Sequence, residues 1–178
     1  MNKGLLIFCL LLTGTAEAQK YNSTKGSISF LSDALIEDIA AENTAALAIL
    51  DASSRQLAFS VPVNEFQFEK KLMQAHFNEK YLETEKYPKA TFQGSLSDFS
   101  MTSKASQQVT AKGKLTIHGV TKDVQIPGTL LIDAKSEIKI NAAFVVALKD
   151  YNVKIPKLLW ENIAEEVNVK IDFTLQPK

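Results

Sequence analysis

The chain has 178 residues, of which 46% are hydrophobic and 22% are charged, values typical of one globular domain with its own core. Lysine and arginine together number 20, and so do aspartate and glutamate. This balance excludes the strong basic excess that favours binding to nucleic acid or to an anionic membrane. The single cysteine, Cys9, lies in the N-terminal segment described next, so the rest of the chain cannot form a disulfide or a thiolate metal site.

The first 18 residues have the pattern of a secretory signal peptide. Lys3 supplies a positive charge, Leu5 to Leu12 form an apolar run, and Ala16 and Ala18 are the small residues that precede a cleavage site. The apolar run is too short to span a bilayer of about 30 Å as a helix. We therefore expect a signal peptide at residues 1–18, one domain at residues 19–178, a periplasmic or secreted location and no stable insertion into a membrane.

Short alternating segments begin the predicted domain. Ser27 to Phe30 alternates polar and apolar residues and predicts a strand. Leu35 to Ala41 fits either a helical turn or an irregular link. Ala45 to Leu50 and Gln56 to Val63 are joined by the turn-forming residues Asp51 to Ser54, which together predict a β-hairpin.

The periodicity then changes from two residues to that of a helix. Between Glu69 and Tyr81, the side chains of Leu72, Met73, His76 and Phe77 recur on one side of a helical turn, with polar residues opposite. This spacing predicts an amphipathic helix of about three turns. No other stretch of the mature chain predicts a helix as clearly.

The rest of the chain reads as further strands. In Val109 to His118, apolar residues alternate with polar ones, and Gly119 breaks the run at a tight turn. Val124 and Ile126 resume the alternation, and Pro127 is expected to stop this strand or to mark it as an edge strand. The other predicted strands are Ala90–Leu96, Thr129–Asp133, Ile138–Val146 and Val167–Leu175.

About eight strands with one helix indicate a mainly β protein, since strands that do not alternate with helices disfavour a parallel doubly wound sheet. Strands that each have one apolar face suit a closed antiparallel barrel or a sandwich. A small barrel can fill its centre with side chains or hold one apolar ligand, and the pattern favours neither.

Candidate catalytic residues are few. His76 is expected to be a packed histidine of the helix, and His118 a turn histidine that bonds the local backbone. Glu83 and Glu85 fit a solvated acidic pair, and the lone Trp160 fits a core residue or a plug at one barrel mouth. The sequence holds no nucleophile, phosphate-loop or metal-ligand motif, so we expect no catalytic residue, no metal and no cofactor.

Two motifs resemble the YceI family, bacterial polyisoprenoid-binding barrels. The first is Gly113 to Pro127, with Leu-Thr-Ile-His-Gly-Val-Thr-Lys at its centre, and the second is Tyr87-Pro88 followed by Phe92. The strand and helix from Ser60 to Phe77 are similar to the family in order, and the resemblance runs from about Ser27 to Phe173. The chain lacks the histidine that the family often carries soon after its first strand, and Asp150 to Glu161 departs from the general pattern.

The resemblance implies an eight-stranded antiparallel lipocalin-like β-barrel with one amphipathic helix. It implies that the barrel interior binds an isoprenoid lipid or a quinone without catalysis, for transport, storage or sequestration in the cell envelope. The alternatives are a stress-related interaction protein with a filled barrel, and an enzyme that uses the barrel cavity. Nucleic acid is not an expected partner, and the oligomeric state is open, with a homodimer as one option. The candidate ligand-binding residues are Phe59, Phe77, Phe92, Leu115, Ile117, Phe144, Ile171 and Phe173.

Overall fold

The computed structural model describes residues 19–33, 38–155 and 164–178. The predicted signal peptide, Trp160 and the first three residues of the Leu35–Ala41 stretch lie outside the described residues. The last three residues of that stretch belong to a strand. Within the described ranges, no helix has the length and apolar character needed to cross a membrane.

Ten strands and four short helical segments make up the described chain. The helical segments are η1 (Val63–Glu65), α1 (Lys71–His76), η2 (Phe77–Tyr81) and η3 (Leu148–Tyr151). The strands are β1 (Lys20–Ser32), β2 (Ile39–Asn43), β3 (Leu47–Asp51), β4 (Gln56–Pro62), β5 (Gln67–Phe68), β6 (Lys89–Leu96), β7 (Gln107–Ile117), β8 (Val120–Ile132), β9 (Ile138–Ala147) and β10 (Glu166–Pro177).

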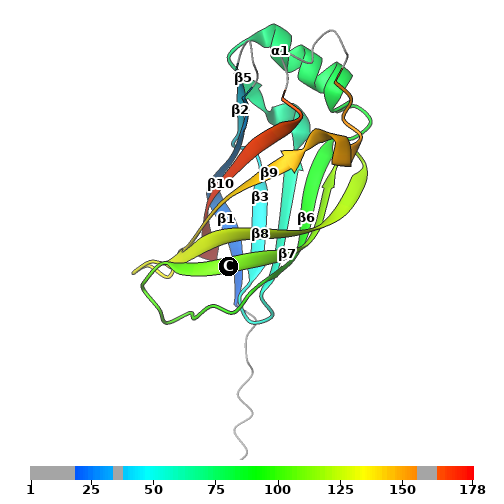
Figure 1. Cartoon of the computed structure of the whole chain (residues 1–178). Helices are drawn as coiled ribbons and strands as arrows, with labels where there is room; N and C mark the ends of the chain where they lie inside the picture. The colour runs from blue at the N-terminus through cyan, green and yellow to red at the C-terminus, as the bar shows by residue number, and fades with distance from the viewer. Residues whose placement is uncertain (1–18, 34–37, 156–163) are drawn as a thin grey trace, which may run out of the picture.

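Eight of these strands close into an antiparallel barrel in the order β1-β3-β4-β6-β7-β8-β9-β10 (Figure 1). The ring closes where β10 returns to β1, in a ladder that runs from Tyr21 opposite Pro177 to Leu31 opposite Asn168. β2 and β5 extend the upper half of β1 beyond the ring. The predicted eight-stranded antiparallel barrel with one helix is confirmed.

The prediction that Pro127 stops or edges its strand is wrong, because β8 continues through Pro127 and includes the segment predicted as a separate strand. Pro127 lies opposite Thr110, whose backbone N–H donates to Ser97 Oγ (3.0 Å) and whose carbonyl accepts from the Ser97 N–H (2.9 Å). Thr110 therefore points its polar backbone atoms away from β8, and the pair is a non-hydrogen-bonded one. The proline nitrogen faces β9, whose ladder with β8 begins only at Gly128, so the ladder needs no N–H at this position.

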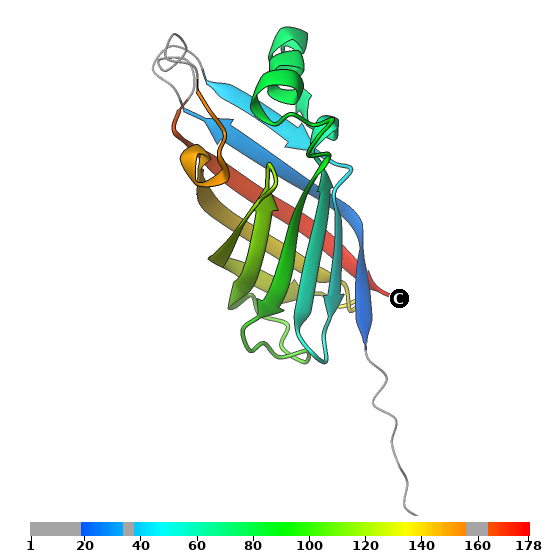
Figure 2. The same cartoon turned by 90° about the vertical axis from the view of Figure 1, so that its right-hand side faces the viewer.

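One end of the barrel is filled and the other carries the helix. In Figures 1 and 2, α1 and η3 lie at the same end, opposite the turn between β3 and β4. Toward that opposite end, large side chains pack inside the barrel with 0–1% exposure. These side chains are Tyr21, Leu50, Leu130, Ile132, Ile138, Phe173 and Leu175. We call this group the plug.

The helix is shorter than predicted and presents a different face to the barrel. Its α-helical part covers Lys71–His76 and continues as a π-helix to Tyr81. Met73 and Phe77 pack against the core, whereas Leu72, predicted on the apolar side, is 68% exposed. The barrel therefore contacts only the narrow side of the helix that carries Met73 and Phe77, and Leu72 lies outside this contact.

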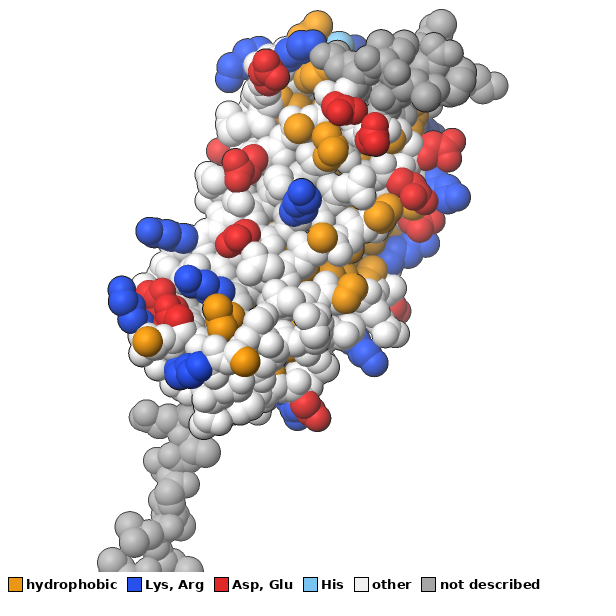
Figure 3. Space-filling model, turned by 60° about the vertical axis from the view of Figure 1, so that its left-hand side comes forward, with side chains coloured by type: hydrophobic (Ala, Val, Ile, Leu, Met, Phe, Trp, Pro, Cys, Tyr) orange, Lys and Arg blue, Asp and Glu red, His pale blue; other side chains and the backbone are white. Residues whose placement is uncertain are grey.

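The outer surface mixes charges of both signs. Figure 3 shows basic and acidic side chains interspersed over one face, with hydrophobic side chains scattered among them. In the described part of the chain, the large hydrophobic residues that are exposed include Leu47 and Ile49 on β3 and Val145 on β9. The apolar faces of the strands otherwise point inward, which places the remaining space of the barrel next to hydrophobic side chains.

Candidate functional site

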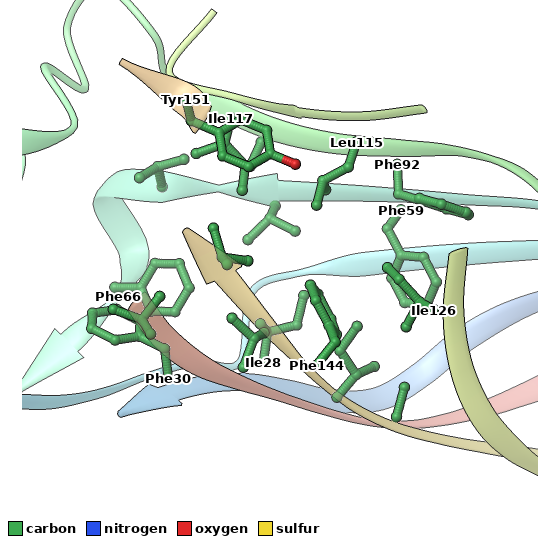
Figure 4. A pocket seen from close by; sticks show the side chains of 18 of the residues that line it. Ile28, Phe30, Phe59, Phe66, Phe92, Leu115, Ile117, Ile126, Phe144 and Tyr151 are labelled. Atoms are coloured by element: carbon green, nitrogen blue, oxygen red, sulfur yellow. The ribbon is translucent and has the colours of Figure 1, made fainter. Parts of the chain in front are cut away.

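A cavity of about 350 Å³ occupies the upper half of the barrel (Figure 4). Its lining residues come from β1, β2, β4, β5, β6, β7, β8, β9 and β10 and from the helical segments at the mouth. Nearly all are aliphatic or aromatic, and none of the lining residues that the structure describes is Asp, Glu, Lys or Arg. Such a volume lies at the lower end of the range of small-molecule pockets, and an interior this apolar suits a hydrocarbon ligand.

Four phenylalanines form the wall of the cavity below the helix. Phe30 of β1 stacks on Phe77 of η2, with ring centroids 5.7 Å apart. Phe66 and Phe68 pack their rings against both, at centroid distances between 5.0 and 5.9 Å. Edge-to-face and offset aromatic pairs of this kind are favourable beyond their buried area. The cluster attaches the helical segment to the barrel and supplies an aromatic rim near the mouth.

Side chains rather than strand pairing close the upper wall between β8 and β9. These two strands pair only from Gly128 opposite Ala142 down to Ile132 opposite Ile138. Above that, η3 and Val153, two residues after it, cover the space, with Tyr151 and Val153 buried against Ile117 and Phe144 of the barrel. In Figure 4 the Tyr151 ring lies beside Ile117 at the edge of the cavity.

The structure brings together seven of the eight sequence-predicted ligand-binding residues. Seven of them line the cavity, namely Phe59, Phe77, Phe92, Leu115, Ile117, Phe144 and Ile171. Phe173 does not line it. Its ring is fully buried in the plug and packs edge-to-face on Phe59 at a centroid distance of 5.1 Å. Phe173 thus lies behind the deep end of the cavity.

Sequence reasoning missed several lining residues. Phe30 ends the predicted strand Ser27–Phe30, whereas Phe66 and Phe68 lie outside the predicted strands, and only the fold shows that all three meet Phe77. Tyr151 lies in a segment without clear periodicity, so no signal in the sequence pointed to it. Ile28 and Val169 also line the cavity, and the alternation along β1 and β10 places both on the inward face.

The polar groups of the lining lie mainly at the mouth. Ser32, His76, Tyr81 and Tyr151 belong to the upper ends of β1, the helical segment and η3. Burial raises the pKa of the Tyr81 and Tyr151 hydroxyls, and for Tyr151 the nearby Asp150 charge adds to the increase. Both hydroxyls therefore stay neutral well above neutral pH, so the mouth offers uncharged hydrogen-bonding groups.

His118 lies beside the mouth and has a structural role, because its ring makes hydrogen bonds to distant segments of the chain. Its Nε2 lies 2.7 Å from Glu83 Oε2, and its Nδ1 lies 3.2 Å from the Tyr151 carbonyl oxygen. The prediction that it bonds the backbone of its own turn is wrong, and Glu83, predicted as merely solvated, is its partner. The Tyr87 ring packs edge-on against the imidazole, with centroids 4.6 Å apart. His118 joins three segments that are distant in sequence, and it does not line the cavity.

Comparisons with known proteins agree with this architecture. The family model of the YceI-like domain matches residues 17–175. A polyisoprenoid binding domain from Saccharophagus degradans has a TM-score of 0.77 at 13% identity, with 90% of this chain and 99% of that chain covered. BcnA from Burkholderia cenocepacia has a TM-score of 0.67 at 18% identity, with 84% and 95% covered.

A YCEI protein from Campylobacter jejuni is also similar, with a TM-score of 0.56 at 14% identity, and 100% of this chain and 93% of that chain covered. No curated protein matches the chain. At these identities the solved structures show a shared fold, whereas the family model spans nearly the whole sequence. The chain therefore belongs to the family of YceI-like domains.

Proposed function

We propose that this protein binds a long-chain isoprenoid lipid inside the upper half of its barrel and carries, stores or sequesters it in the cell envelope without catalysis. The observation that supports the proposal most directly is the cavity of about 350 Å³ lined almost entirely by hydrophobic side chains. Burial of each methylene-sized group contributes about 0.8 kcal/mol, so a prenyl tail binds tightly with few polar contacts. The similar domain from Saccharophagus degradans is described as polyisoprenoid binding.

The lining also bears on the head group. Among the described residues it contains no charged side chain, and its mouth offers the neutral hydroxyls of Tyr81 and Tyr151. An uncharged head group, such as that of a prenyl alcohol or a quinone, suits this mouth better than a diphosphate, which requires cationic partners. The signal-peptide pattern of residues 1–18 supports a periplasmic or secreted location. The open cavity favours ligand binding over the alternative of a barrel filled by its own side chains.

The test is to purify the protein, extract it with organic solvent and identify any bound prenyl lipid by mass spectrometry. A fluorescent prenyl alcohol then measures the affinity of two matched variants. Ile117→Trp places a large ring in the cavity and is expected to weaken binding by about tenfold or more. Ile49→Trp makes the same substitution on the outer face, where Ile49 is 52% exposed, and is expected to leave the affinity unchanged.

Two results would contradict the proposal. One is a protein that is free of lipid as purified and does not take up the probe. The other is equal affinity of wild type and a correctly folded Ile117→Trp variant, which would place the probe outside the cavity.

A further inference from the structure

The cavity is open at one end and blocked at the other. The polar groups Ser32, His76 and Tyr81 lie at the end that carries the helix. Two other polar lining residues, Thr91 and Asn141, stand beside the inward-facing Phe92 and Ala142 on their strands, so their side chains point outward. The deep end is therefore apolar, and a ligand with a polar head enters tail first.

The deep end is formed by Phe59 and Phe92, which the plug supports, together with Leu57, Leu96 and Val109, which also line the cavity. In Figure 4, Phe59 and Phe92 lie at the end of the cavity away from Phe30 and Phe66. The Phe59 and Phe92 rings pack edge-to-face, with centroids 6.5 Å apart. Phe59 in turn packs edge-to-face on Phe173, whose side chain has 0% exposure.

The position of Phe173 is fixed by the strand opposite. Phe173 pairs with Gly26 of β1, and its ring lies where a Cβ on residue 26 would be. The absence of that Cβ lets the ring lie flat over β1 and fill the barrel behind Phe59. The remaining plug residues pack at the same end with 0–1% exposure, and none of them lines the cavity.

We infer that the barrel selects its isoprenoid ligand by tail length, and that Phe59, supported from behind by Phe173, is the stop that sets the longest tail fully enclosed. This inference rests on the proposed function and adds a specificity-determining residue to it. Each isoprene unit that enters the cavity gains burial, whereas a unit beyond the limit must remain outside the mouth in water. Affinity thus increases with tail length up to a break and then stops increasing.

The experiment measures dissociation constants for a series of prenyl alcohols that differ by one isoprene unit each. For wild type, each added unit should raise the affinity by about tenfold or more until the break. Phe59→Ala removes the stop and should move the break to a longer tail. Ala111→Leu, which adds bulk to a small lining residue near the deep end, should move the break to a shorter tail.

Circular dichroism checks that each variant folds, and Phe59→Leu replaces Phe59→Ala if the larger truncation unfolds the barrel. The inference is overturned if wild type shows no break across the series, or if neither a Phe59 variant nor Ala111→Leu moves it. If wild type binds no member of the series, the proposed function fails, and the inference fails with it. A length-independent affinity, by contrast, leaves isoprenoid binding intact and removes only the stop.

Discussion

At the residue scale, His118 shows how one side chain can hold the mouth together. Both of its partners, a carboxylate and a carbonyl, are hydrogen-bond acceptors, so the imidazole links the Glu83 side chain to the Tyr151 backbone. The backbone at His118 and at Glu83 adopts the left-handed region, with φ of 50° and 43°. Such conformations are uncommon outside glycine, and they persist here because the contacts around the imidazole hold both residues.

We expect His118→Ala to lower the free energy of unfolding by about 1–3 kcal/mol, because it removes both bonds and leaves the Tyr151 carbonyl without this donor. Chemical denaturation with a tryptophan or circular dichroism signal measures the change. His76→Ala is the matched control, since no hydrogen bond of its ring is found within the described residues. Equal effects of the two substitutions would show that His118 contributes no more than an ordinary histidine.

The sequence predicts which strand residues face inward, but it does not predict the hydrogen-bond partners of His118. Alternation along each strand correctly predicted inward-facing residues such as Phe92 and Leu115. Glu83 and Tyr151, by contrast, are 35 and 33 residues away from His118. Their approach depends on how η2 and η3 fold over the mouth, and no periodic pattern encodes that. The sequence could therefore predict that His118 makes structural hydrogen bonds, but it could not predict Glu83 and Tyr151 as the partners.

At the element scale, β6 and β7 approach each other closely where Gly94 lies opposite Gly113. A Cβ on Gly94 would overlap the carbonyl oxygen of Lys112, and a Cβ on Gly113 would overlap that of Gln93. Glycine is therefore required at this contact because it lets the two backbones come together. This contact lies between Phe92 and Leu96, which both line the cavity.

Gly94→Ala is expected to reduce the free energy of unfolding by about 1–3 kcal/mol, since the added methyl group forces the two strands apart. Thermal or denaturant unfolding measures the loss, and Ser95→Ala, on the adjacent position of the same strand, is the control. A Gly94→Ala protein as stable as wild type would mean that the strands separate at this point without penalty.

Element boundaries were the least predictable part of the fold. Pro127 predicted a strand end because proline has no backbone N–H to donate to a neighbouring strand. The sequence does not show that its nitrogen faces β9 at a position where β8 and β9 do not pair. The helix was predicted from its period, yet Leu72 faces solvent because the barrel contacts only the Met73 and Phe77 side. In both cases the tertiary surroundings decided the outcome, and those surroundings are not encoded in a local window.

At the scale of the whole molecule, a barrel was predictable and a half-filled barrel was not. Alternating strands and the family motifs predicted the closed antiparallel architecture. Whether the interior is solid or hollow depends on which inward-facing residues reach each other across the barrel, as Phe59 and Phe173 do. The result is a solid lower half that holds the ring of strands together and an open upper half that leaves room for a ligand.

Three partly or fully buried tyrosines are expected to make the folded protein less stable at alkaline pH. Burial raises the pKa of Tyr21, Tyr81 and Tyr151 above their ordinary value. In the unfolded chain these hydroxyls ionise near about pH 10, whereas in the folded protein they keep their protons to higher pH. Above about pH 10 the folded state therefore binds more protons than the unfolded state. The contribution of these tyrosines to the free energy of unfolding is fully present below about pH 10, and it is lost as the pH rises through their pKa values in the folded protein.

We expect the melting temperature to be nearly constant from neutral pH to about pH 9 and to decrease above about pH 10. Replacing Tyr21, Tyr81 and Tyr151 together by phenylalanine should flatten this decrease, because phenylalanine has no proton to release. Tyr21→Phe alone should also raise the stability at neutral pH by about 1 kcal/mol, since the Tyr21 hydroxyl is buried with no hydrogen-bond partner among the described residues. An identical alkaline decrease in wild type and the triple variant would assign it to other groups, such as the surface lysines.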